Sequence, residues 1–99
     1  MENMQYNSMN IVGTVVSDPI RKGKNFSFDI ENRRGNHVLP FFVFVRNDER
    51  PIDVNEGDQV VITNAGFYVD KDGKNCLAVV EGSCLEVIRK RCNMGEVEV

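Results

Sequence analysis

The stretch NFSFDIENRRGNHVLPFFVFVR, residues 25–46, decides the fold because it contains two candidate β-strands joined by a tight turn. Its first half alternates apolar and polar side chains with the two-residue period of a strand that has one buried face. The apolar set is Phe26, Phe28 and Ile30, and the polar set is Ser27, Asp29 and Glu31. We therefore predict a strand over residues 25–31, followed by a turn over residues 32–36 around Gly35.

The second half, residues 37–46, is apolar in both of its alternating phases. One phase holds Leu39, Phe41, Val43 and Val45, and the other holds Pro40, Phe42, Phe44 and Arg46. Because Arg46 cannot easily be buried without a partner, we expect its phase to face outward and the first phase to face the core. Phe42 and Phe44 are then expected on the outer surface, where an exposed aromatic ring calls for a functional explanation.

The rest of the chain contains further strand and turn signals, with no repeat or linker. We predict a first strand over residues 9–17, bent at Gly13 and stopped at Asp18-Pro19. Residues 47–57 are expected to form a loop or a single turn. A fourth strand is predicted over residues 58–70, broken near residues 64–66, and Asp72-Gly73 signals a hairpin. A fifth strand follows over residues 75–88, interrupted at Gly82-Ser83.

Five strands without helical periodicity favour a small closed barrel over a sandwich, which typically has about seven strands or more. We therefore predict an all-β, five-stranded OB-fold (oligonucleotide-binding) barrel. The 99 residues form one domain, 1–99, with the barrel over about 9–88. In this architecture nucleic acid crosses strands two and three, between the first-to-second and fourth-to-fifth loops.

The composition points to a soluble protein without catalytic machinery. Apolar residues make up 41% and charged residues 27%, and no apolar run approaches the roughly 18 residues of a membrane span. The N-terminal residues show no secretory signal, so we expect a cytoplasmic protein. Cys76, Cys84 and Cys92 lack C-x-x-C spacing and are expected to be reduced thiols. With His37 as the only histidine, no catalytic pair can be assembled, and we expect no enzyme activity, cofactor or metal.

Four segments follow one another in an order that resembles a known family. They are MNIVGTVVSDPIRK, NFSFDIENR, FFVFVR and EGDQVVITNAGFYVDKDGKNCLAVVEGSCLEVI. The chain resembles bacterial single-stranded DNA-binding proteins and their relative, the N-type primosomal replication protein, over about residues 9–88. The most specific pieces are G-x-x-x-x-x-P, at Gly13 and Pro19, and G-x-Q-V-x-I, which begins at Gly57.

This resemblance implies a homo-oligomeric OB-fold protein, a dimer or a tetramer, that binds single-stranded DNA in replication, recombination or repair. Replication proteins are its implied partners. Phe44 then takes the position of a DNA-stacking aromatic residue and Arg46 that of a phosphate-contacting lysine. The sequence departs from the family in having no Trp, no helix-forming segment after the third strand and a short hairpin after the fourth. These departures imply a smaller footprint on DNA.

Charge is distributed unevenly, although the net charge is only -3. Seven of the 12 Lys and Arg residues lie in the three turns expected around strands two and three: Arg21, Lys22, Lys24, Arg33, Arg34, Lys71 and Lys74. Five acids are expected on the far side: Asp48, Glu49, Asp53, Glu56 and Asp58. The chain is therefore expected to present one basic pole to phosphates.

The predicted site combines stacking and phosphate contacts. Stacking is assigned to Phe42, Phe44 and Tyr68, and phosphate contacts to Arg21, Lys22, Lys24, Arg33, Arg34, Arg46, Lys71 and Lys74. Such a platform tolerates different sequences and accepts RNA as well as DNA. Two alternatives stay open at this stage: a single-stranded RNA binder, and an OB-fold protein-protein interaction module in which the outward phenylalanines form a dry interface.

Overall fold

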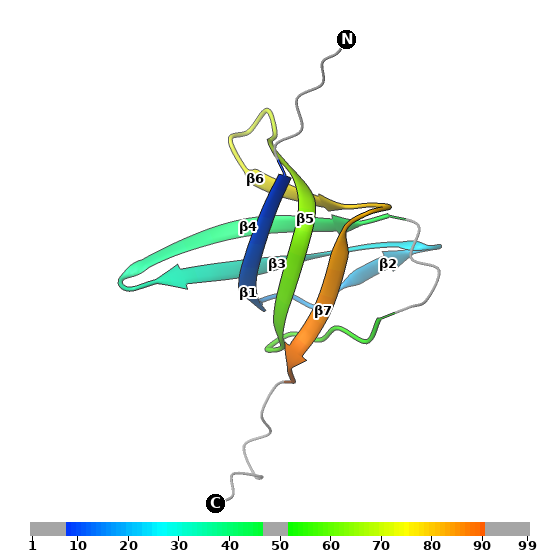
Figure 1. The fold of residues 1–99 in the computed structure, drawn as a ribbon, viewed down its shortest axis with the longest axis horizontal. Coiled ribbons are helices and arrows are strands. Elements are labelled where there is room, and N and C mark those ends of the chain that lie inside the picture. Colours follow the sequence, from blue (N-terminus) through cyan, green and yellow to red (C-terminus); the bar gives the residue numbers. More distant parts are fainter. Residues whose placement is uncertain (1–7, 47–51, 91–99) are drawn as a thin grey trace, which may run out of the picture.

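The computed structural model describes residues 8–46 and 52–90, which build one barrel of β-strands (Figure 1). The strands are β1 (Ser8–Val15), β2 (Ile20–Lys22), β3 (Asn25–Arg34), β4 (His37–Val45), β5 (Gln59–Val69), β6 (Asn75–Val79) and β7 (Cys84–Arg89). These two described ranges contain no helix, and hence none long and apolar enough to cross a membrane.

The barrel closes through pairings between strands that are distant in the sequence. Around the ring, β1 pairs with β3, β3 with β4, β4 with β6, β6 with β5, and β5 with β1. All these pairings are antiparallel except β4–β6, where Phe42–Val45 runs parallel to Cys76–Val79. Strand β7 continues the fifth strand along the first half of β5. The predicted all-β, five-stranded OB-fold barrel is confirmed.

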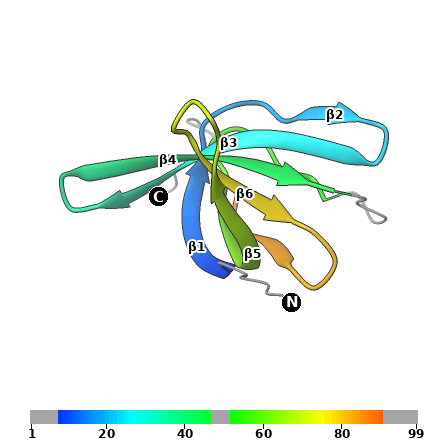
Figure 2. The ribbon, with the colours of Figure 1, turned by 90° about the horizontal axis from the view of Figure 1, so that it is seen from above.

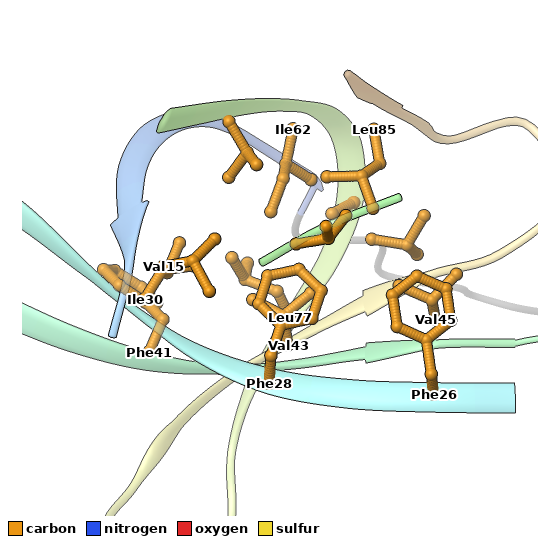
Figure 3. Close-up of a cluster of buried hydrophobic side chains, with 14 residues drawn as sticks. Val15, Phe26, Phe28, Ile30, Phe41, Val43, Val45, Ile62, Leu77 and Leu85 are labelled. Carbon is orange, nitrogen blue, oxygen red and sulfur yellow. The ribbon is translucent and has the colours of Figure 1, made fainter. Parts of the chain in front are cut away.

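The core confirms the inward phase predicted for the two central strands. Phe26, Phe28 and Ile30 of β3 lie opposite Val45, Val43 and Phe41 of β4, and all six side chains are buried. Figure 3 shows them pointing into the same interior as Ile62, Leu77 and Leu85 from the other side of the barrel. Burial of this apolar surface is the main favourable contribution to folding.

Gly13 lies just before the point where β1 gains a second neighbour. β1 pairs with β5 from Ser8 to Thr14, and it pairs with β3 at Thr14 and Val15. A Cβ atom on Gly13 would lie 2.8 Å from Cδ1 of Ile30 and 3.2 Å from both Cβ of Ile30 and the carbonyl oxygen of Glu31, so a side chain there would force β3 or Ile30 to shift. The glycine is therefore needed for close approach, whereas the irregularity in register lies earlier, between Met9 and Ile11.

The expected loop after the first strand contains an additional strand, β2. Strand β3 extends past the short β1–β3 ladder, which leaves its first residues with a free edge. Residues 20–22 fill this edge, with Ile20 opposite Ser27 and Lys22 opposite Asn25. The three-residue strand is too short to show an alternating pattern, which is why the sequence did not reveal it.

The hairpin between β3 and β4 is longer than predicted. Its ladder continues to the pair Arg34–His37, so the turn is shorter than residues 32–36. Pro40 is compatible with this long strand because β6 joins β4 only from Phe42 onward. The distal half of the hairpin projects beyond β1 and β5, at the opposite end from β2 (Figures 1 and 2).

The predicted break in the fourth strand is a bend within the continuous strand β5. Asn64 has a φ of 55°, and its backbone N–H donates to Oδ1 of Asn10 at 2.8 Å. Its side-chain amide donates to the carbonyl of Gly82, and its own carbonyl accepts from Oγ of Ser83. At this corner β5 passes from β7 to β6, and the predicted interruption of the fifth strand at Gly82-Ser83 is confirmed.

The hairpin predicted at Asp72-Gly73 is confirmed and joins β5 to β6. Gly73 has a φ of 82°, which a residue with a side chain rarely adopts. Oδ1 of Asp70 accepts hydrogen bonds from the backbone N–H groups of Asp72 and Lys74, both at 2.9 Å. Asp70 therefore shapes this turn, as aspartate commonly does.

Candidate functional site

The outer face, as we call it here, is formed by the side chains of β2, β3, β4, β6 and β5 that point away from the core. Strand pairing arranges them in two adjacent rows across the sheet. One row contains Asp29, Phe42, Cys76 and Tyr68, and the next contains Ile20, Ser27, Phe44, Ala78 and Gly66. The three aromatic residues predicted to stack on bases therefore share one surface.

Phe42 lies at the centre of the first row, between a carboxylate and a thiol. Nζ of Lys74, from the β5–β6 hairpin, lies 5.2 Å from the centroid of the Phe42 ring, within cation–π range. The same nitrogen lies 3.7 Å from Oδ1 of Asp29. One lysine therefore contacts both the ring and the acid beside it.

Tyr68 ends this row and is 47% exposed. Its cross-strand neighbour Cys76 is buried, and Sγ of Cys76 lies 3.5 Å from the carbonyl of Lys74. Burial raises the pKa of the Tyr68 hydroxyl above its ordinary value, and the nearby Cys76 and Asp70 raise it further. The phenol is therefore neutral at physiological pH and can stack as an uncharged ring.

Phe44 stands among small side chains in the second row. Ser27 lies opposite it on β3 and Ala78 opposite it on β6. Gly66 follows Ala78 across β5, and even a Cβ there would make only ordinary contacts. Phe44 itself is half-buried, so its ring is outward but not fully in solvent. The small neighbours leave room for a planar group above this part of the sheet.

Lys22 and Arg46 border the outer face where the β3–β4 ribbon passes β2. Lys22 lies opposite Asn25, in the same phase as Ile20 and Ser27. Arg46 is exposed at the end of β4, where its backbone N–H donates to the carbonyl of Val79 at 3.0 Å. Together with Lys74, they place positive charge around the aromatic rows.

The side chain of Arg21 points away from the outer face. It pairs with Phe26 on the inner phase, and its guanidinium carbon lies 4.3 Å from the centroid of the Phe26 ring. A hollow of about 330 Å³ beside it is also lined by Asp18 and Asp53. Asp53 therefore lies away from the outer face, as expected, and it is Arg21 that does not join the basic side chains predicted to surround that face.

The acidic segment is held there by its own packing. Val54 is buried in the core, and Asp58, 1% exposed, forms an ion pair with Nζ of Lys90 at 3.1 Å. Oδ2 of Asp58 also accepts from the backbone N–H of Asn55. Asp58 is thus a structural acid rather than part of a charged surface, Glu56 is exposed, and Asp48 and Glu49 fall outside the described residues.

The remaining predicted phosphate ligands lie at separate ends of the fold. Lys24 belongs to the turn between β2 and β3, and Lys71 to the β5–β6 hairpin. Arg33 and Arg34 lie within β3, on the distal half of the β3–β4 hairpin, rather than in a turn. Since this end is opposite β2 (Figure 1), the single basic pole expected from the sequence is wrong. Basic side chains instead border the outer face at both ends.

Sequence reasoning missed several members of the outer face. Ile20 had no signal, because its strand was predicted to be a loop, and Cys76 was interpreted as an ordinary thiol. Asp29 was placed correctly in the outward phase, but its position beside Phe42 depends on strand register. Within residues 8–46 and 52–90, no three potential metal ligands lie together, and Cys76 and Cys84 are free thiols. Cys92 lies outside the described residues.

Comparisons with known proteins support the fold. No family model matches the chain and no curated protein matches it. Pot1pC of Schizosaccharomyces pombe, in a crystal structure with the single-stranded DNA CGGTTACGGT, has a TM-score of 0.60 at 15% identity, covering 88% of this chain and 82% of that chain. Fission yeast Pot1, in a crystal structure with single-stranded DNA, has a TM-score of 0.56 at 14% identity. That match covers 88% of this chain and 37% of the Pot1 chain.

Proposed function

We propose that this protein binds single-stranded DNA on the outer face, largely independently of base sequence, and that it has no catalytic role. As its setting we propose replication, recombination or repair, in the cytoplasm and as a homo-oligomer, with replication proteins as partners. The bacterial single-stranded DNA-binding and primosomal proteins that the sequence resembles suggest this setting. The Pot1 structures, which share the fold, contain the same class of ligand.

The observation that carries the proposal is the grouping of Phe42, Phe44 and Tyr68 on one outward surface. They come from two strands that are far apart in the sequence, and closure of the barrel brings them into adjacent rows. Stacking of a base on an aromatic side chain contributes about 1–3 kcal/mol and accepts every base, because every base has a π-face. Three such rings therefore provide affinity with little sequence preference.

Phosphate contacts supply the second part of the binding energy. Lys22, Arg46 and Lys74 border the rings, so a strand whose bases lie on the aromatic residues can place its phosphates near these side chains. Phosphate neutralisation releases counterions, and affinity therefore falls as salt concentration rises. A dry interface with a protein partner would show little dependence on salt.

The test is a titration of fluorescent oligo(dT) and oligo(rU), about ten nucleotides long, at two salt concentrations. We expect saturable binding of oligo(dT) that weakens with salt. The double variant Phe42→Ala, Tyr68→Ala should lose binding, whereas Ile88→Ala, which removes an exposed apolar side chain of β7 outside the outer face, should not. Tighter binding of oligo(rU) would favour RNA as the ligand. Failure to bind either oligonucleotide would overturn the proposal.

A further inference from the structure

The carboxylate of Asp29 lies in the middle of the proposed base-binding surface. Asp29 is the cross-strand partner of Phe42, and its side chain is 42% exposed. Its backbone is fixed from the edge of the sheet, where its N–H donates to Oγ of Ser17 and its carbonyl accepts from the N–H of Val16, both at 2.8 Å. The acid is therefore presented beside the Phe42 ring by a rigid strand.

An acid at this position opposes binding of the phosphate backbone. Like charges repel, and a carboxylate offers phosphate oxygens no hydrogen-bond donor. Nζ of Lys74, 3.7 Å away, offsets part of this repulsion but leaves the acceptor atoms in place. Asp29 is therefore suited to meet a donor group, and the donor groups along a DNA strand are on the edges of its bases.

The position of Asp29 relative to Phe42 selects the edge that it can meet. Directly paired residues on adjacent strands have Cβ atoms about 4.5–5.5 Å apart. A base stacked on the Phe42 ring extends over this spacing and brings its Watson–Crick edge toward Asp29 when its sugar lies on the β6 side. Unpaired bases are commonly recognised through this edge while they stack on an aromatic side chain.

The four bases present different groups to a carboxylate. Guanine has two adjacent donors, N1–H and the N2 amino group, which match the two carboxylate oxygens. Cytosine and adenine each present one amino group, as in the carboxylate contact to the cytosine amino group. Thymine has a single N3–H between two carbonyl oxygens, both of which repel a carboxylate.

We propose that Asp29 reads the base stacked on Phe42 and favours guanine over thymine at that one position. The inference rests on the proposed function and refines it: binding is sequence-tolerant at Phe44 and Tyr68 and selective at Phe42. A good bidentate contact gives discrimination of about 5- to 150-fold between bases.

The experiment compares oligo(dT) of about ten nucleotides with the same oligonucleotide carrying a single dG at each position in turn. For the unmodified protein, we expect one or a few dG positions to tighten binding by about 5- to 150-fold. Asp29→Asn should remove this preference and tighten binding of oligo(dT), because the carboxylate no longer repels the thymine carbonyls and the phosphates. Glu86→Gln makes the same charge change on β7, outside the outer face, and should preserve the preference.

The outcomes separate this inference from the proposed function. If the protein binds oligo(dT) and no dG position tightens binding, base selection by Asp29 is overturned while DNA binding stands. A dG preference that persists in Asp29→Asn also overturns it. If no oligonucleotide binds at low salt, the proposed function itself fails. Melting temperatures of both variants, compared with that of the unmodified protein, establish that each is folded.

Discussion

Phe41 and Phe44 project from opposite faces of β4. Phe41 is 4% exposed and packs edge-on against Phe67 in the core, with ring centroids 6.3 Å apart. Phe44 is half-buried on the outer face, between Ser27 and Ala78. The two phenylalanines thus offer a matched pair of substitutions that separate binding from folding.

We predict that Phe44→Ala weakens binding of single-stranded DNA by about 5- to 150-fold, because one stacked base is lost. Its effect on stability should be well below that of Phe41→Ala, which we expect to lower the free energy of unfolding by about 3–5 kcal/mol. Fluorescence titration and urea denaturation of both variants measure these effects. A folded Phe41→Ala beside an unfolded Phe44→Ala would contradict the assigned roles.

Neighbouring basic residues on β2 should differ in their contribution to salt dependence. We predict that Lys22→Gln reduces the slope of log affinity against log salt by about 0.7, the value for one phosphate on a single strand. Arg21→Gln should leave the slope nearly unchanged, because Arg21 lies over the Phe26 ring on the inner phase. Titrations at four salt concentrations give the slopes. Equal slopes for the two variants would show that the direction in which these two side chains point does not determine their contact with phosphate.

The inward and outward phases of β3 and β4 were predictable because each strand carries polar markers in its outward phase. Asp29 and Arg46 assign the phases from local pattern alone, and Asp72-Gly73 located its hairpin through turn chemistry. The meeting of Phe42 with Cys76 was not predictable in this way. It depends on parallel pairing of β4 with β6, which leaves no trace in the alternation of either strand.

The distribution of charge on the surface also could not be predicted from the local sequence pattern. The direction of Arg21 follows from the pairing of β2 with β3, and the buried charge of Asp58 is compensated by an ion pair with Lys90, far along the chain. Counting charges by turn therefore grouped side chains that the fold separates. Strand phase predicted correctly which side chains of β3 and β4 face outward, whereas the proximity of loops did not predict where the basic side chains lie.

The corner at Asn64 should contribute measurably to stability. Asn64→Ala loses the side-chain hydrogen bond to Gly82. It also places alanine, whose side chain cannot form a hydrogen bond, at a φ of 55°. We expect a loss of about 1–3 kcal/mol. Asn64→Gly loses the same hydrogen bond but tolerates the backbone conformation, so it should cost less. Urea denaturation measures both, and a larger loss for the glycine variant would contradict this account.

Alkaline pH should destabilise the fold. The hydrogen bond to Asp58 raises the pKa of Lys90, and burial raises the pKa of Tyr68. Each group therefore holds its proton more tightly in the folded state, and its contribution is complete below its unfolded pKa and lost as pH rises through its folded pKa. We expect melting temperatures to fall above pH 10 (Tyr68's ordinary value is 10.0) and Lys90→Met to show a shallower fall. An unchanged melting temperature at pH 11 would contradict this.

We predict a dimer in solution, formed through strand edges. Among the described residues, β7 pairs only with β5, so its other edge is open, and Val12 exposes an apolar side chain on β1. An open edge is a template for pairing with a second chain. Light scattering at micromolar concentration should give about twice the 11.2 kDa mass of one chain. A mass near 11.2 kDa would reject the dimer.

The parallel pairing of β4 with β6 also determines when the barrel can close during synthesis of the chain. Residues 8–46 contain β1 to β4, yet the outward edge of β4 beside Phe42 and Phe44 stays uncovered until Cys76–Val79 has left the ribosome. Until then, a nascent chain presents an unpaired edge next to aromatic side chains, a combination prone to aggregation. Closure of the barrel is therefore a late event in folding. The strand that completes the proposed DNA-binding surface, β6, is also the strand that covers the open edge of β4 in the nascent chain.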